Sequence, residues 1–138
     1  MATKEIYITD NDMKRLRELI MVARDYGQED EKDLKELEDE LDTAKIVKFK
    51  DIPKDVITMN SEIHLLDVVA EEEVVYKLVF PNQANANEGK VSIMAPIGTA
   101  LLGYSVGDVI EWKVPGGITR LKVEKILYQP EASEDYHL

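Results

Sequence analysis

The sequence contains no cysteine and only two histidines, His64 and His137, which stand far apart. The missing cysteines exclude disulfide bonds and thiolate metal sites, and two distant histidines do not favour a zinc site built on paired histidines. No run approaches the ~18 consecutive apolar residues of a membrane span, and the charged first ten residues are unlike a secretory signal. We therefore expect a cytoplasmic protein that does not contact a membrane.

Positive charge is also scarce, since the 138 residues carry a formal net charge of −11. A protein that binds free nucleic acid needs a basic footprint, so direct nucleic-acid binding is not expected. Most of the excess lies in residues 25–42, where ten acidic residues stand against two lysines. This segment is either a solvated helix face or an acidic probe aimed at a basic or metal-containing site.

Residues 1–50 show the periodicity of two helices that pack as a short antiparallel coiled-coil hairpin. Residues 9–11 (Thr-Asp-Asn) are favourable N-cap types, with Asp12 in a weak capping-box position, and Gly27 can end the first helix in a left-handed conformation. A second helix is expected to begin near Asp30. Apolar residues spaced three, four and three apart form a coiled-coil seam on each helix. The seam residues are Met13, Leu16, Ile20 and Ala23 in the first helix and Leu34, Leu37, Leu41 and Ala44 in the second.

The two seams fix a register for the hairpin, because facing residues of antiparallel helices have numbers with a constant sum. This register predicts three ion pairs across the hairpin, each worth only ~0–1 kcal/mol if exposed. The pairs are Arg15 with Asp42, Arg17 with Glu40, and Arg24 with Asp33. Each arm has about 14–17 residues, so the hairpin should project only ~20–25 Å at ~1.5 Å per residue.

Beyond Pro53, which interrupts a continuing helix, the period of the apolar residues changes to two. A short helix is expected to begin at Pro96, and the alternation slips near Glu124, which indicates a β-bulge. The expected strands cover residues 61–68, 73–80, 90–94, the segment after Asp108, and 118–128. Residues 51–138 thus form a second domain, an antiparallel sheet with one short helix, and the chain belongs to the α+β class.

No nucleophile and base stand in a catalytic arrangement, and no glycine-rich loop opens a helix, so neither enzymatic activity nor a cofactor is expected. Two short stretches remain as candidate sites. At the end of the hairpin, Asp25, Glu29 and Asp30 are either a solvated acidic turn or ligands that share a Mg²⁺ with another protein. The turn Met94-Ala95-Pro96-Ile97-Gly98 is either a docking surface or a purely structural turn.

Several ordered blocks in the second half resemble the C-terminal domain of the Gre family of transcription factors. The blocks are the stretch from Ser92 to Gly103, which ends in Ala-Leu-Leu-Gly, then Val106-Gly107-Asp108, and then Val114-Pro115-Gly116-Gly117. The Rnk-type branch, the regulators of nucleoside diphosphate kinase, is more similar still. Its features are the stretch from Pro53 to Ser61, Met94-Ala95-Pro96, and the tail from Tyr128 to Tyr136.

This resemblance implies an FKBP-like second domain and docking near the secondary channel of bacterial RNA polymerase, with Met94, Ala95 and Pro96 in the contact. Separately, a monomer is expected. It also implies a contrast, because Gre factors carry a much longer coiled coil. The end of that coiled coil holds a catalytic Mg²⁺ with an Asp and a Glu three residues apart. The preferred function is therefore a polymerase-binding regulator that competes with Gre factors without stimulating transcript cleavage.

Two other functions stay open. One is a transcript-cleavage and elongation factor that uses Asp25, Glu29 or Asp30 to hold Mg²⁺ in the polymerase. The other is a free-standing FKBP-like isomerase or chaperone, although a shared fold does not carry a shared activity.

Overall fold

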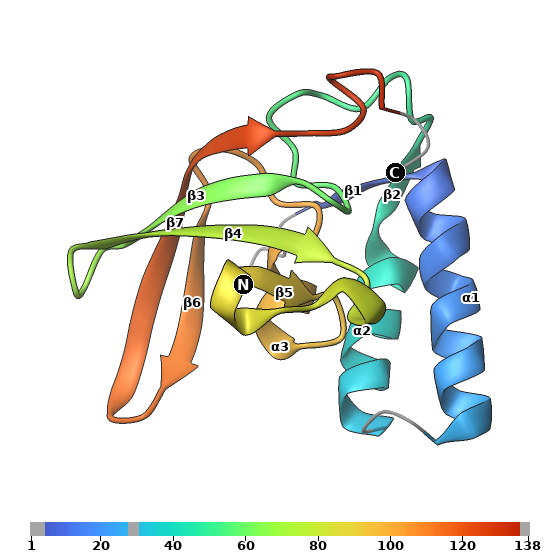
Figure 1. Ribbon diagram of the computed structural model, residues 1–138, viewed down its shortest axis with the longest axis horizontal. Helices are drawn as coiled ribbons and strands as arrows, with labels where there is room; N and C mark the ends of the chain where they lie inside the picture. The colour runs from blue at the N-terminus through green and yellow to red at the C-terminus, as the bar shows by residue number, and fades with distance from the viewer. Residues whose placement is uncertain (1–4, 28–30, 136–138) are drawn as a thin grey trace.

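A helical hairpin stands beside a strongly twisted sheet in the computed structural model, which describes residues 5–27 and 31–135 apart from the side chains of Trp112 and Val114 (Figure 1). The helices are α1 (Asp10–Tyr26), α2 (Glu31–Thr43) and α3 (Pro96–Leu101). The strands are β1 (Tyr7–Thr9), β2 (Lys45–Val47), β3 (Glu62–Asp67), β4 (Glu72–Val79), β5 (Lys90–Ser92), β6 (Val109–Val114) and β7 (Gly117–Tyr128). The predicted α+β class is confirmed. None of the helices described is both long and apolar enough to cross a membrane.

The hairpin forms as its sequence pattern predicts. Thr9 caps α1, since its hydroxyl oxygen accepts a hydrogen bond of 3.0 Å from the backbone N–H of Asp12. Gly27 ends α1 in the left-handed region, at a φ of 61° that a side chain would disfavour. Seven of the eight seam residues are buried and Ala44 is partly buried against them. Burial of these side chains, at about 25 cal/mol per Å² of apolar surface, holds the two helices together.

The arginines on the flanks of the hairpin form ion pairs with carboxylates other than the predicted ones. The ion pairs are Arg15–Asp12 at 2.5 Å, Arg17–Asp42 at 2.8 Å, Arg24–Glu31 at 2.9 Å and Arg24–Glu38 at 3.2 Å. The constant-sum rule describes the seam, whereas a long side chain on the flank reaches carboxylates on neighbouring turns of the facing helix. Arg15 turns instead to a buried carboxylate at the base of α1.

A parallel pair of three-residue strands closes the open end of the hairpin. β1 leads into α1 and β2 follows α2, with Tyr7 opposite Lys45 and Thr9 opposite Val47. Neither strand could be predicted from the sequence, because three residues are too few to show an alternation. The pair clamps the two ends of the hairpin to each other.

The second part of the chain forms a five-stranded sheet in the order β5-β4-β3-β7-β6. β3 runs antiparallel to both of its neighbours and β6 runs antiparallel to β7, so the sheet is antiparallel as predicted except at one edge, where β5 pairs parallel with β4. The predicted bulge is confirmed, since His64 pairs with Lys125 and Leu65 with Val123, which leaves out Glu124. The register slips a second time at Leu127.

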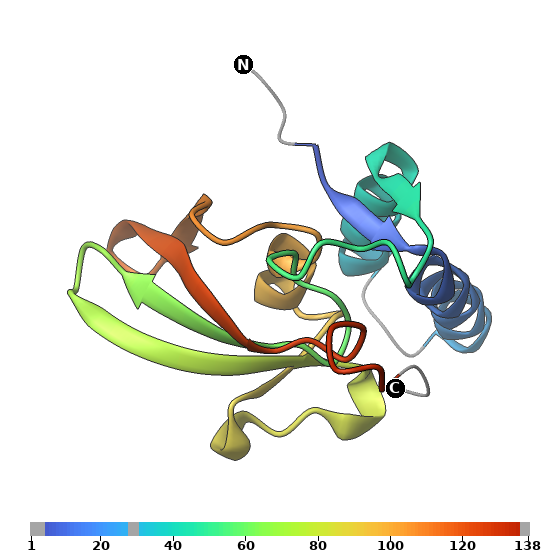
Figure 2. The same cartoon turned by 90° about the horizontal axis from the view of Figure 1, so that it is seen from above.

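α3 lies between the sheet and the hairpin in both views of the ribbon (Figures 1 and 2). Buried apolar residues of the hairpin and of the sheet therefore belong to a single cluster, which includes Leu37, Ile57, Leu65 and Leu101. The proposed domain boundary at residue 50 thus divides a chain whose two parts share a core. The sheet with one helix is consistent with an FKBP-like arrangement, which stays a prediction.

Candidate functional site

The candidate docking turn joins β5 to α3 and is held by a dense set of local hydrogen bonds. The hydroxyl of Ser92 accepts from the N–H of Met94 at 3.0 Å, and the carbonyl of Ser92 accepts from the N–H of Ala95 at 3.0 Å. The hydroxyl of Thr99 donates to the carbonyl of Ile93 at 2.7 Å. The turn is consequently fixed before any partner arrives, which lowers the entropic cost of binding.

Close packing beneath the turn requires a glycine. A Cβ added to Gly98 would lie 2.1 Å from the carbonyl oxygen of Ser92, so no other residue fits without a backbone shift. Met94 is also buried, whereas Pro96 is exposed and Ala95 and Ile97 are partly exposed. Of the five residues predicted for docking, Met94 and Gly98 therefore support the turn, and the other three can touch a partner.

The end of the hairpin offers one described acidic candidate. Asp25 is exposed in the last turn of α1, while Glu29 and Asp30 lie outside the described residues. Within residues 5–27 and 31–135, no group of three or more histidine, cysteine or acidic side chains is placed to hold a metal ion. The metal-sharing role of the three acids stays a prediction.

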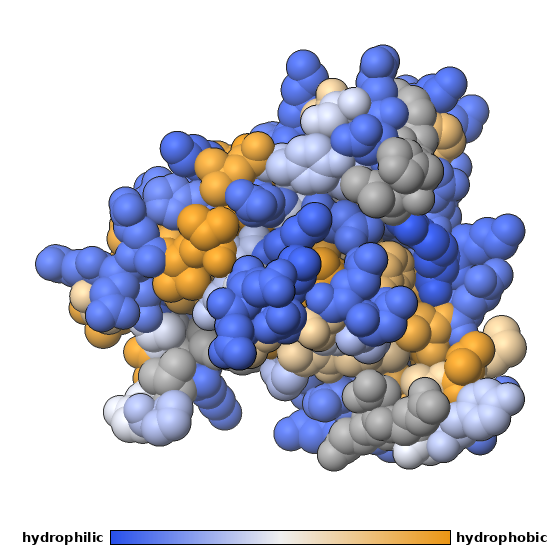
Figure 3. All heavy atoms as spheres, in the orientation of Figure 1, coloured by the Kyte–Doolittle hydropathy of each residue, from blue (hydrophilic) through white to orange (hydrophobic). Residues whose placement is uncertain are grey.

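An exposed apolar face lies near the end of α1 and was not predicted from the sequence. Met21, Val22 and Tyr26 are 61%, 50% and 75% exposed, and Figure 3 shows apolar side chains at the surface towards this end of the hairpin. The signal was present in the sequence, since these residues lie off the seam that defines the buried side of the helix. Exposed apolar side chains that gather in this way are typical of a contact surface.

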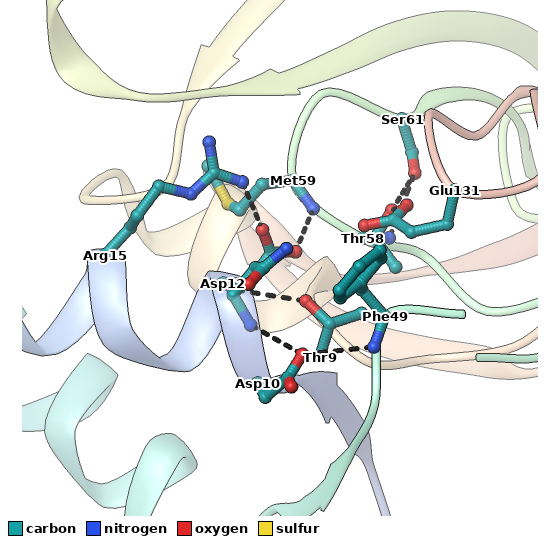
Figure 4. A network of polar contacts seen from close by, with 10 residues as sticks. Thr9, Asp10, Asp12, Arg15, Phe49, Thr58, Met59, Ser61 and Glu131 are labelled. Carbon is teal, nitrogen blue, oxygen red and sulfur yellow. Dashed lines mark hydrogen bonds and ion pairs between the residues drawn. The ribbon is translucent and has the colours of Figure 1, made fainter. Parts of the chain in front are cut away.

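A polar junction fixes the base of the hairpin to the second part of the chain (Figure 4). The side chain of Asp12 is 1% exposed. Its Oδ2 accepts from the N–H of Met59 at 3.0 Å and its Oδ1 pairs with Nη2 of Arg15 at 2.5 Å. Burial raises the pKa of Asp12 above its ordinary value, and the Met59 N–H and Arg15 oppose that shift. In a capping box Asp12 would reach back to its own helix, but here it reaches across to the sheet domain.

Further contacts widen the same junction. The guanidinium of Arg15 lies 5.0 Å from the centre of the Phe80 ring, a cation–π contact. Oδ1 of Asp10 accepts from the N–H of Phe49 at 3.0 Å. On the far side, the Thr58 hydroxyl donates to Glu131 at 2.7 Å, and burial raises the pKa of Glu131. The junction therefore joins the start of α1, the connector and the C-terminal tail, and it sets how the hairpin stands relative to the docking turn.

Comparisons with known proteins place both halves of the chain in one family. Residues 52–128 match the family described as transcription elongation factor GreA/GreB, C-terminal, and residues 4–47 match the Rnk N-terminus. The regulator of nucleoside diphosphate kinase of Escherichia coli strain K12 is 44% identical over 100 residues, which cover 72% of this chain and 74% of that protein. Transcription elongation factor GreA of Syntrophotalea carbinolica is 36% identical over 95 residues, 69% of this chain and 60% of that protein.

The fold agrees with the sequence comparisons. A solved structure described as a prokaryotic transcription elongation factor GreA/GreB, from Nitrosomonas europaea, matches with a TM-score of 0.76 at 35% identity. The match covers 90% of this chain and 100% of that one. The resemblance that the sequence blocks indicated is thereby confirmed. This chain belongs to the Gre family of transcription regulators, in the branch that carries the Rnk N-terminus.

Proposed function

We propose that this protein binds bacterial RNA polymerase at the entrance of the secondary channel and displaces Gre factors without stimulating transcript cleavage. The polymerase as partner follows from membership of the Gre family. The observation that carries the rest of the proposal is the length of the hairpin. α1 has 17 residues and α2 has 13, which correspond to about 26 Å and 20 Å at ~1.5 Å per residue.

A short hairpin allows the protein to dock at the entrance of the channel without stimulating transcript cleavage. The resemblance to cleavage factors implies that a longer coiled coil must carry an acidic pair to a Mg²⁺ deep in the polymerase. In this chain the residue three positions after Asp25 is Gln28, an amide that cannot supply the second carboxylate. A hairpin that stops short leaves the metal untouched and still fills the entrance.

The arrangement of the surface supports one partner that contacts both parts of the chain. α3 packs against α2, so the turn formed by Ala95, Pro96 and Ile97 lies beside the hairpin (Figure 2). A protein seated on this turn can therefore also meet the hairpin. The apolar face of α1 adds a contact that suits apolar residues in a channel wall.

Two measurements test the proposal. In the first, Ala95→Arg places a long charged side chain in the turn, and we expect it to weaken binding to core polymerase by about tenfold or more. Asn82→Arg, which makes a similar change at an exposed position outside the turn, is the matched control and should bind as wild type. Equal binding of both variants would remove the turn from the interface.

The second measurement uses stalled elongation complexes. Wild-type protein added with Mg²⁺ should leave the length of the nascent RNA unchanged, although it occupies the polymerase. Shortened transcripts would contradict the proposal and favour the cleavage-factor alternative, in which acids at the end of the hairpin hold the metal.

A further inference from the structure

A cavity of about 250 Å³ opens on the inner face of the sheet, next to the docking turn. Its apolar walls come from Leu65 on β3, Val74 and Tyr76 on β4, and Leu121 on β7. Ile97, one of the three docking-turn residues that reach the surface, forms part of the same wall. Pockets for small molecules usually measure about 300–1,000 Å³, so this cavity suits a single side chain better than a free ligand.

Two carboxylates face each other at one end of this cavity. Asp67 is the direct cross-strand partner of Glu72, and like charges in that position destabilise a sheet. Asp67 is held by the hydroxyl of Thr119 and by the N–H groups of Val69 at 3.1 Å and Ala70 at 3.0 Å. These hydrogen bonds, that from Ala70 first, lower the pKa of Asp67, which therefore stays ionised at neutral pH.

Within residues 5–27 and 31–135, no ion pair neutralises the negative charge at this end of the cavity. Glu72 is exposed, and in the described part of the chain no lysine, arginine or histidine forms an ion pair with it. The residues that line the cavity include no cationic side chain. An occupant with an apolar stem and a positive end would thus match both the walls and the charge.

We infer that this cavity receives an arginine side chain of the protein that docks on the turn at Ala95, Pro96 and Ile97, with its guanidinium at Asp67 and Glu72. The methylene stem lies along Leu65 and Leu121. Arginine fits better than lysine because its planar fork can bond two carboxylates at once and can stack on an aromatic ring such as that of Tyr76. The identification of the docked protein as RNA polymerase rests on the proposed function, whereas the chemistry of the cavity does not.

Glu72→Lys is the variant that tests the cavity, and Glu73→Lys is its matched control. Both residues are exposed on β4 and both changes alter the net charge equally. Glu72 lies on the face of the cavity, whereas Glu73 lies on the opposite face, 3.5 Å from His64. Glu72→Lys replaces the repulsion with Asp67 by an attraction, so it should unfold at the same or a slightly higher denaturant concentration than wild type. Glu73→Lys should change the midpoint little, because the residue is exposed.

The first arm uses ¹⁵N–¹H correlation spectra during titration with N-acetyl-arginine methylamide. We expect saturable shifts of the amides of Leu65, Val74, Thr119 and Leu121 in wild type and in Glu73→Lys, and their loss in Glu72→Lys. The same compounds built on lysine and on leucine are the reference probes. An equal response to either reference probe, or no saturable shift with the arginine probe, would overturn the inference.

The second arm measures binding to core polymerase. Glu72→Lys should weaken it by about tenfold, because a like charge then faces the arginine, and Glu73→Lys should change it by less than about twofold. Equal affinities of the two variants would show that the cavity takes no part in this interaction. Absence of binding by wild type itself would refute the proposed function, and the spectra of the first arm would then decide the inference alone.

Discussion

Removal of the buried carboxylate at the hairpin junction should cost far more stability than its single ion pair suggests. Asp12→Ala leaves the N–H of Met59 without its acceptor, which costs about 1–3 kcal/mol for a buried group. It also leaves Arg15 without its anion, a loss of about 3–5 kcal/mol for a fully buried pair. The Arg15 side chain is 36% exposed, so water replaces part of that contact. We expect Asp12→Ala to lower the free energy of unfolding by about 3 kcal/mol.

Asp12→Asn distinguishes the effect of the charge of Asp12 on stability from the effect of its side-chain volume. The amide keeps the volume and one acceptor for Met59, and it removes a charge that burial disfavours, so we expect a loss of about 1 kcal/mol. Urea unfolding followed by circular dichroism measures both values, and Asp25→Ala on the exposed end of the same helix should change stability by less than ~0.5 kcal/mol. An Asp12→Ala protein as stable as that control would refute the reasoning, as would an Asn variant that loses as much as the Ala variant.

The difference in unfolding free energy between wild type and Asp12→Asn should depend on pH with a definite sign. Burial raises the pKa of Asp12 in the folded state, so the ionised carboxylate costs stability at neutral pH. That cost disappears as the pH falls through the folded pKa towards the ordinary value of 3.8. The Asn variant does not titrate at this position. The stability difference between the two proteins should therefore move in favour of wild type as the pH is lowered, and a shift the other way would contradict the assignment.

Three other predictions concern separate parts of the molecule. Gly98→Ala forces a methyl group against the carbonyl oxygen of Ser92 and should destabilise the fold by about 2–3 kcal/mol in urea unfolding; a loss below ~0.5 kcal/mol would contradict the close packing of this turn. Burial and the hydrogen bond to Asp135 raise the pKa of Tyr128 to about 12. The stability that the protonated Tyr128 hydroxyl contributes should therefore be intact below pH 10 and lost as the pH rises towards 12. Absorbance of the phenolate at alkaline pH measures this, with Tyr128→Phe to identify its signal, and a group that titrates near 10 would disprove the shift. Tyr26→Ser removes an exposed ring, and should leave urea unfolding within ~0.5 kcal/mol of wild type while weakening polymerase binding several-fold; unchanged affinity would exclude the apolar face of α1 from the interface.

The hairpin could be predicted from sequence because its signals are periodic and redundant. Eight apolar seam residues, a threonine N-cap and a glycine C-cap all indicate the same hairpin, and seven of the eight are buried. The ion pairs could not be predicted, since Arg24 bonds Glu31 and Glu38 rather than the residue that faces it in the seam register. Flexible side chains on an exposed flank select partners by local geometry, which the order of residues alone does not determine.

The sheet was predictable in its strands and less so in their pairing. Alternation located β3, β4 and β7, and its slip located the bulge at Glu124. The direction of β5 was missed, because a three-residue strand carries no sign of whether its neighbour runs parallel or antiparallel. The same limitation hid the opposition of Asp67 and Glu72, which exists only once the register of β3 and β4 is known.

The candidate site was likewise predictable in part from the sequence. The family blocks drew attention to the candidate docking turn, but burial of Met94 and Gly98 could be read only from the packing of α3 against β5. Asp12 was visible as part of a weak capping pattern, and its role at the junction depends on Met59, far along the chain. Contacts between segments that are distant in sequence are the part that a single sequence leaves undetermined.

Displacement of a fluorescently labelled Gre factor from core RNA polymerase tests the central claim most directly. With the labelled factor bound near its dissociation constant, increasing amounts of this protein should release it completely, with a midpoint that moves to higher concentration as more Gre factor is added. Full retention of the Gre factor at saturating concentrations of this protein would contradict the account, because two proteins that dock at one entrance cannot be bound together.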